Sequence, residues 1–187
     1  MSATLPIFNT PTAVFPRFPM RHRAYPVFPE LHTPDLLLRE LSADDLEGTL
    51  DLTFYDGQPA TSLPMAQRML EVMARDYRLG NGIHWGVVLK ATNTIVGTCG
   101  FYRGFAHGGG EIGYVLRDAY RGRGIMAQAV QAIITFGWHE LHLRQITAYC
   151  EPDNHASQAL LRKLHFAPFG TTDDGLLAFR LLPPAPC

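Results

Sequence analysis

The sequence predicts a mixed α/β (α+β) fold, with helices packed around one central sheet. Apolar runs of strand length alternate with runs of helical spacing along the chain. Their order is strand, two helices, three strands, helix, strand, helix and strand, which describes a layered domain. The chain has 187 residues, of which 47% are hydrophobic, so one domain with a substantial core is expected.

Composition excludes several classes of function. The formal net charge of −1 argues against a general nucleic-acid-binding protein, and no apolar run is long enough to span a bilayer. We therefore expect neither a nucleic-acid partner nor a membrane partner. The three cysteines, Cys99, Cys150 and Cys187, form no CxxC pair and fit a reducing compartment, so a cytoplasmic location is expected.

No metal site is expected. His139 and His142 could share a helix face, but the zinc-protease spacing HExxH is absent. Cys150 lies near the end of an apolar strand. We interpret it as a buried structural cysteine rather than a covalent acyl carrier, because no His–Asp pair can be assigned to activate it.

Residues 1–34 are expected to form an extended N-terminal arm, and residues 35–187 the folded domain. Seven prolines in the arm exclude a regular helix or a central strand. Interleaved aromatic residues suggest that the arm lies across a surface. A targeting peptide is the alternative, but the prolines would interrupt both a signal sequence and a transit helix.

Each later segment has its own signal. Ser42 can cap a helix whose first turn holds Asp44 and Asp45. Short turns between the three consecutive strands predict antiparallel pairing. Gly108–Gly110 precede a strand, so they predict a hairpin loop rather than a phosphate loop. The predicted strands are 36–41, 83–90, 94–103, 111–117, 144–150 and 176–182, and the predicted helices are 42–52, 65–79, 125–143 and the capped segment within 151–166.

The stretch AYRGRGIMAQAV predicts an anion site. It joins a strand to a helix through Arg121, Gly122, Arg123 and Gly124. The first N–H groups of a helix lack intrahelical partners, glycine allows close approach to the backbone, and arginine adds charge and donors. This combination favours a pyrophosphate, and the alternative is a tight turn with solvated arginines. Walker and GxGxxG patterns are absent, which leaves coenzyme A as the common choice.

Two motifs resemble the GNAT family of N-acetyltransferases. YRGRGIMAQAV is similar to the family's acyl-CoA loop, with Arg121 and Gly124 at matching positions. Met126 replaces the usual Gly or Ala, as in the branch that acetylates the N-termini of ribosomal proteins. EPDNHASQALLRKLHF resembles that branch's second motif, which Asn154, Ser157, Lys163 and Phe166 match and His165 breaks. The resemblance spans roughly residues 35 to 182.

The resemblance implies a mostly antiparallel sheet, splayed between its fourth and fifth strands, EIGYVLR and ITAYC. Acetyl-CoA, the implied co-substrate, would place its pantetheine arm in the splay and pair with one strand edge. An N–H near Val115 would stabilise the oxyanion. The implied binding residues are Tyr114, Val115, Leu116, Arg121, Gly122, Arg123, Gly124, Ile125, Met126, Asn154 and Ser157.

The implied reaction is direct attack of a primary amine on the thioester. Glu111 is the candidate base, or alternatively a solvated hairpin end. Ser157 is the candidate partner of the thiol, because Leu161 stands where many family members have tyrosine. Ser157 could instead bond only to backbone, and Asn154 could be only a helix cap.

The expected function is N-acetylation of a protein N-terminal α-amine. One alternative is a small-molecule amine bound in an acidic pocket around Asp44, Asp45, Asp51 or Asp56. Another is a non-catalytic acyl-CoA-binding module. A homodimer is possible from the resemblance.

Overall fold

The central element is an eight-stranded sheet with the order β1-β2-β5-β6-β7-β8-β10-β9. The structure is a computed structural model that describes residues 25, 27–55 and 57–184. Every neighbouring pair in this sheet is antiparallel except β7 and β8, which are parallel. The predicted mixed α/β fold is confirmed. The strands are β1 (Leu31–His32), β2 (Leu36–Arg39), β5 (Ile83–Leu89), β6 (Thr94–Tyr102), β7 (Gly109–Leu116), β8 (Gln145–Cys150), β9 (Ala167–Thr171) and β10 (Leu177–Leu181).

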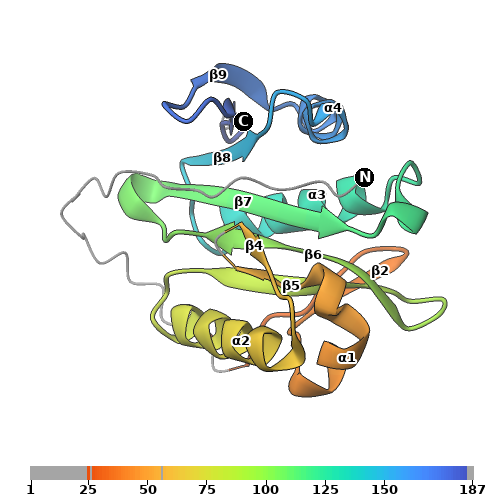
Figure 1. Ribbon diagram of the computed structural model, residues 1–187. Helices are drawn as coiled ribbons and strands as arrows, with labels where there is room; N and C mark the ends of the chain where they lie inside the picture. The colour runs from red at the N-terminus through yellow and green to blue at the C-terminus, as the bar shows by residue number, and fades with distance from the viewer. Residues whose placement is uncertain (1–24, 26, 56, 185–187) are drawn as a thin grey trace.

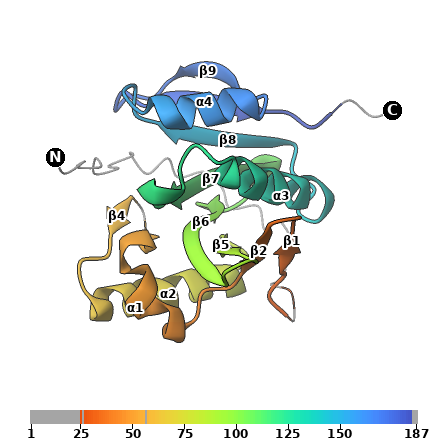
Figure 2. The ribbon, with the colours of Figure 1, turned by 90° about the vertical axis from the view of Figure 1, so that its right-hand side faces the viewer.

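Helices cover both faces of the sheet. α1 and α2 lie on one face and α3 on the other (Figures 1 and 2), while α4 contacts β8 and α3. The helices are α1 (Leu46–Thr49), α2 (Leu63–Arg78), α3 (Ile125–His139) and α4 (His155–Lys163), with 3-10 turns at Ala43–Asp45, Leu50–Leu52, Ala106–Gly108 and Asp118–Tyr120. None of the helices in the described ranges is long and apolar enough to cross a membrane.

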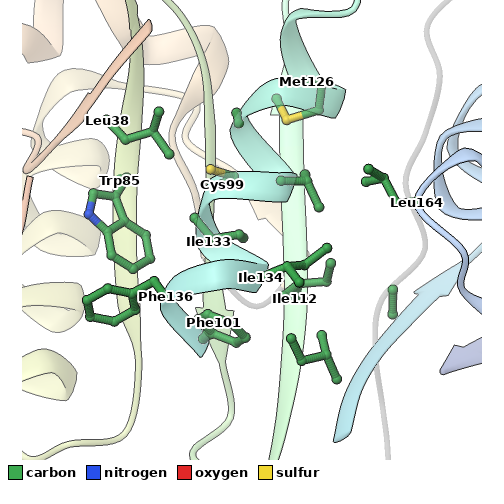
Figure 3. Packing of buried hydrophobic residues seen from close by; sticks show 14 of the residues in the cluster. Leu38, Trp85, Cys99, Phe101, Ile112, Met126, Ile133, Ile134, Phe136 and Leu164 are labelled. Carbon is green, nitrogen blue, oxygen red and sulfur yellow. The ribbon is translucent and has the colours of Figure 1, made fainter. Parts of the chain in front are cut away.

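The main core lies between α3 and the sheet (Figure 3). Trp85 and Phe101 from the strands are fully buried there, and the rings of Trp85 and Phe136 meet edge to face at 5.3 Å. Gly137 lets α3 approach the sheet closely, since a Cβ at this position would stand 2.8 Å from the Phe101 ring. This packing fixes the direction of α3, and therefore the position of its N-terminus, relative to β7.

The first predicted helix is broken. The segment forms a 3-10 turn, the single turn α1 and a second 3-10 turn. Helix propensity is low here because of Gly48, and the hydroxyl of Thr49 donates to the Asp45 carbonyl at 2.8 Å. Asp45, beyond the predicted cap Ser42, accepts the Ser42 N–H at 2.8 Å and closes the turn.

Besides the short edge strand β1, two strand regions were not predicted. β9 contains Pro168 and Gly170, which are depleted in strands but tolerated at a sheet edge, where β9 lies. The hairpin of β3 (Phe54–Tyr55) and β4 (Gln58–Pro59) forms a separate small sheet. Both elements depend on tertiary neighbours rather than on a local pattern.

The prediction of a hairpin loop at Gly108–Gly110 was wrong in part. Gly109 and Gly110 begin β7 and pair with Gln145 and Ile146 of β8. A Cβ at Gly110 would stand 2.7 Å from Leu143, so glycine is required there by close packing. The interaction between β7 and β8 therefore begins earlier along the chain than the sequence pattern indicated.

The described part of the N-terminal arm packs on the domain. The Tyr25 ring lies 5.8 Å from Phe136, and the Phe28 ring lies 5.0 Å from Tyr77. The Trp85 indole N–H donates to the Pro29 carbonyl at 2.7 Å. β1 lies at the sheet edge, where a proline-rich segment can contribute a short strand. The rest of the predicted arm, residues 1–24, lies outside the described residues together with Asp56 and Cys187.

Candidate active site

A wedge opens between β7 and β8. The two strands pair at only three positions, the last of which joins Glu111 to Thr147. Beyond this point β7 stays paired with β6 as far as Leu116, and β8 stays paired with β10 as far as Cys150. In Figure 1 the two strands diverge toward their arrowheads. The predicted splay between the fourth and fifth predicted strands is therefore present.

Backbone groups of β7 face this wedge. The Arg117 N–H donates to the Val96 carbonyl of β6 at 2.9 Å, and the Gly108 carbonyl accepts from Arg144 N on the β8 side. The N–H and C=O groups of successive residues in a strand point toward opposite neighbouring strands. The N–H groups of Tyr114 and Leu116 therefore point into the wedge. The N–H of Val115 points toward β6. An oxyanion donor near Val115 therefore has to be one of its two neighbours.

Two helix N-termini lie at the open end of the wedge. β7 and β8 are parallel, so their C-terminal ends lie at the same side of the sheet, and α3 and α4 follow them. Gly122 and Gly124 have φ of 75° and 76°, a left-handed conformation that favours glycine. Gly124 is the N-cap of α3 and supplies no side-chain cap, and a Cβ there would meet nothing within 4 Å. The first N–H groups of α3 are thus open to an anion.

Arginines add charge to this N-terminus. Arg121 pairs with Asp118 at 2.8 Å, but both side chains are mostly exposed, so the pair is weak and exchangeable. The Arg123 guanidinium lies 5.6 Å from the centre of the Tyr120 ring. The side chain of Met126 is buried in the core instead, so only its backbone can contribute.

Arg117 anchors the loop rather than facing a ligand. Its guanidinium donates to Asp51 through two bonds of 2.8 Å and to the Ile95 carbonyl at 2.8 Å. The hydrogen bond from Arg117 lowers the pKa of the Asp51 carboxyl. Sequence analysis placed Arg117 at the strand edge and missed its contact with Asp51, because this contact joins the loop after β7 to a turn far away in the sequence.

Ser157 and Tyr114 meet across the wedge. The Tyr114 hydroxyl lies 2.7 Å from Ser157 Oγ, and burial raises the pKa of Tyr114 to about 12. Burial raises the pKa of the nearby Cys150 thiol, and the Ser157 hydroxyl opposes part of that rise. Asn154 caps α4 by accepting the Ser157 N–H at 3.0 Å, which holds the serine in place. Leu161, one helical turn after Ser157, is fully buried in the core and has no polar group to offer.

Glu111 lies where the wedge begins, since it is the last residue of β7 paired with β8. Its carboxylate forms an ion pair with Arg103, at the end of β6. Tyr102 pairs with Glu111 across the strands, and burial raises the pKa of the Tyr102 hydroxyl. The sequence reasoning missed Arg103, although antiparallel pairing of the two strands would have placed it beside Glu111.

The structure brings the predicted residues together around one opening. Tyr114 and Leu116 line it, the loop of Arg121–Gly124 lies at its end, and Asn154 and Ser157 begin the helix on its other side. Glu111 and Tyr114 lie on opposite faces of β7, because side chains alternate along a strand. Among the described residues, no group of His, Cys, Asp or Glu side chains could hold a metal ion.

Comparison with known proteins identifies the family. A profile described as "Acetyltransferase (GNAT) domain" matches residues 35–167. The chain belongs to the GNAT acetyltransferase family. It is 30% identical to the uncharacterized N-acetyltransferase YoaA of Bacillus subtilis over 75% of this chain and 84% of that protein. It is 33% identical to the uncharacterized N-acetyltransferase p20 of Bacillus licheniformis over 78% of this chain and 79% of that protein. The predicted enzyme class, an N-acetyltransferase, is confirmed.

Solved GNAT structures share the fold. RimL, a ribosomal L7/L12 alpha-N-protein acetyltransferase solved with coenzyme A, matches with a TM-score of 0.73, 19% identity, and coverage of 82% of this chain and 98% of that one. RimJ of Mycobacterium smegmatis matches with a TM-score of 0.70, 18% identity, and coverage of 82% and 86%. These likenesses confirm the predicted resemblance to the ribosomal-protein branch at the level of the fold.

Proposed function

We propose that this GNAT enzyme transfers the acetyl group of acetyl-CoA to the N-terminal α-amine of a protein. The main observation is the wedge that opens at Glu111, with the uncapped N-terminus of α3 at its end. A pantetheine arm fits a strand edge with unpaired backbone groups, and a pyrophosphate fits the open N–H groups beside Arg121 and Arg123. Acetyl-CoA is the co-substrate of the family to which the chain belongs.

Each group around the wedge has a separate role in the proposed reaction. The N–H of Tyr114 or Leu116 stabilises the oxyanion of the tetrahedral intermediate. Glu111 takes the surplus proton of the attacking amine, directly or through water. Ser157 faces the leaving sulfur, and Asn154 holds Ser157 at the start of α4. No protein nucleophile is required, and Cys150 is buried as a structural cysteine.

The carboxylates near α1 favour a peptide over a polycationic small amine. Asp45 is held by Arg39 through two bonds of 2.8 Å, and Asp51 by Arg117. The hydrogen bonds from Arg39 lower the pKa of Asp45 to about 2, and those from Arg117 lower the pKa of Asp51, so each carboxylate stays ionised and is balanced by an arginine. The acidic pocket considered from the sequence is therefore not formed by Asp45 and Asp51. The structural neighbour RimL, named as an alpha-N-protein acetyltransferase, supports the same class of acceptor.

Calorimetry of acetyl-CoA binding tests the cofactor half of the proposal. The double variant Arg121→Ala with Arg123→Ala should weaken binding by about tenfold to a hundredfold, because two charge-assisted phosphate contacts are removed. Arg68→Ala, on the exposed face of α2, removes the same charge elsewhere and should bind like the wild type. Equal binding by all variants would show that the loop is only a turn.

Acetyl transfer tests the acceptor half. Peptides with a free N-terminus, the same peptides with a blocked N-terminus and one free lysine, and spermidine are compared as acceptors by mass spectrometry. The proposal expects acetylation of the free N-terminus above both others. Preference for spermidine would favour the small-amine alternative. Tight acetyl-CoA binding without transfer to any of the amines would favour the non-catalytic module.

A further inference from the structure

The side chain of Tyr114 bridges the wedge on the side away from Glu111. Even-numbered residues of β7 face the α3 side of the sheet, since Gly110 lies against Phe101 and Leu143. Odd-numbered residues face the α2 side, where Gly113 lies beneath the Tyr102 ring. Tyr114 therefore points toward α3 and α4, and its hydroxyl reaches Ser157 Oγ at 2.7 Å.

Tyr114 keeps its phenolic proton, so either hydroxyl of the Tyr114–Ser157 pair can donate to the other. Burial raises the pKa of Tyr114 to about 12, so the phenol stays protonated at neutral pH. A serine hydroxyl can accept one hydrogen bond and donate its own proton to another group. When Tyr114 donates to Ser157 Oγ, the serine proton is directed elsewhere.

The hydroxyl of Ser157 also influences a neighbouring sulfur atom. Burial raises the pKa of the Cys150 thiol, and the nearby Ser157 hydroxyl opposes part of that rise. The backbone N–H of Ser157 donates to Asn154 at 3.0 Å, which fixes the position of the serine. The hydroxyl thus lies at the wedge in an arrangement that can serve a sulfur anion.

We propose that Tyr114 is a positioning residue for the leaving group, acting through Ser157. This rests on the proposed function, in which coenzyme A lies in the wedge. The amine nitrogen forms the new N–C bond and gives its surplus proton to Glu111, and the C–S bond breaks with its electron pair on sulfur. The thiolate then accepts a hydrogen bond from Ser157, whose oxygen accepts one from Tyr114. No proton leaves Tyr114 or Ser157 in this step.

If Tyr114 acts in this way, the pKa of the coenzyme A thiol should fall when coenzyme A binds. A hydrogen bond to a charged form stabilises that form, so the pKa of the bound thiol falls below that of free coenzyme A measured under the same conditions. Tyr114→Phe keeps the ring and removes the donor. The pKa of the bound thiol should then rise by roughly half a unit to one unit, because the serine proton is no longer directed toward sulfur.

Titration of coenzyme A bound to the full-length enzyme measures this pKa, by thiolate absorbance in the ultraviolet with the protein alone as reference. Ser157→Ala should raise the pKa further than Tyr114→Phe, and the double variant should match Ser157→Ala, because Tyr114 acts only through the serine. Ser157→Thr keeps a hydroxyl and should keep most of the depression. Tyr149→Phe removes a hydroxyl from the facing strand β8 and should leave the pKa unchanged.

The outcomes separate the two proposals. If wild-type protein does not bind coenzyme A, the proposed function and this inference both fall. If it binds and acetylates but Tyr114→Phe leaves the pKa of the bound thiol unchanged, only the role of Tyr114 is overturned. A variant that melts at the wild-type temperature with a shifted thiol pKa supports the role, since a purely structural loss would alter affinity or melting instead.

Discussion

At the scale of single residues, the site depends on pairs that cross between elements. Arg103 holds Glu111, Arg117 holds Asp51, and Tyr114 holds Ser157. Each pair fixes a side chain that would otherwise sample several rotamers, so its geometry is set before any substrate binds. Glu111 and Ser157 are the two members whose chemistry the proposed reaction uses.

Glu111→Gln should lower kcat by about a hundredfold to a thousandfold, because the amine loses its base. The remaining activity should rise with pH toward the α-amine pKa of about 8, since only amine that arrives deprotonated can then react. Acetyl-CoA affinity should stay unchanged. Glu71→Gln, an exposed carboxylate on α2, is the matched control. Full activity in Glu111→Gln would assign Glu111 to a structural ion pair only.

At the scale of elements, the same residue at the start of α4 stabilises the helix and positions a proposed site residue. Asn154 Oδ1 accepts the Ser157 N–H, so one side chain caps the helix and places the leaving-group partner. α2 offers a comparison, because Ser62 Oγ caps it by accepting the Met65 N–H at 3.4 Å and no proposed site residue lies in its first turn. Both side chains cap a helix, but only the Asn154 cap also places a proposed site residue.

Asn154→Ala and Ser62→Ala should each lower the free energy of unfolding by about 1 kcal/mol, as expected for loss of an N-cap. Only Asn154→Ala should also reduce kcat, since Ser157 loses its tether. Asn154→Asp keeps an accepting oxygen and should retain most of the stability. Denaturant unfolding and steady-state kinetics measure the two effects. Unchanged kcat in a destabilised Asn154→Ala would make this residue a cap alone.

Sequence patterns predicted the elements whose signals are local. α3 and the three consecutive strands β5 to β7 have strong periodicity and clear turns, and the loop of Arg121–Gly124 is a continuous motif. β9 was missed because Pro168 and Gly170 are acceptable only at the sheet edge that tertiary structure provides. The contact between Tyr114 and Ser157 could not be predicted, since it depends on how far β7 and β8 diverge.

At the scale of the whole molecule, the sheet separates the two halves of the proposed reaction. Glu111 and Gly113 face the side covered by α2, whereas Tyr114 faces α3 and α4. An amine that reaches Glu111 approaches from the α2 side, and the sulfur leaves toward Ser157 on the other. In the proposed reaction the substrates approach each other through the wedge, because β7 and β8 are not paired beyond Glu111 and Thr147.

The arm residues next to the domain should contribute to the stability of this whole arrangement. Tyr25 and Phe28 pack on Phe136, Tyr77 and Trp85, which link α3, α2 and β5. A chain that starts at Asp35 loses these contacts and β1, although the family profile also begins there. It should unfold with about 2–4 kcal/mol less free energy than a chain that starts at Tyr25.

Denaturant unfolding of the two shortened chains measures this difference, and Trp85→Phe in the longer one removes the hydrogen bond to the Pro29 carbonyl together with part of a buried ring. The lost hydrogen bond should cost about 1 kcal/mol, in addition to the cost of the smaller ring in the core. Equal stability of both shortened chains would mean that the core between α3 and the sheet is complete without the arm. A large loss would extend the folded unit to Tyr25, ahead of the boundary drawn from the sequence at Asp35.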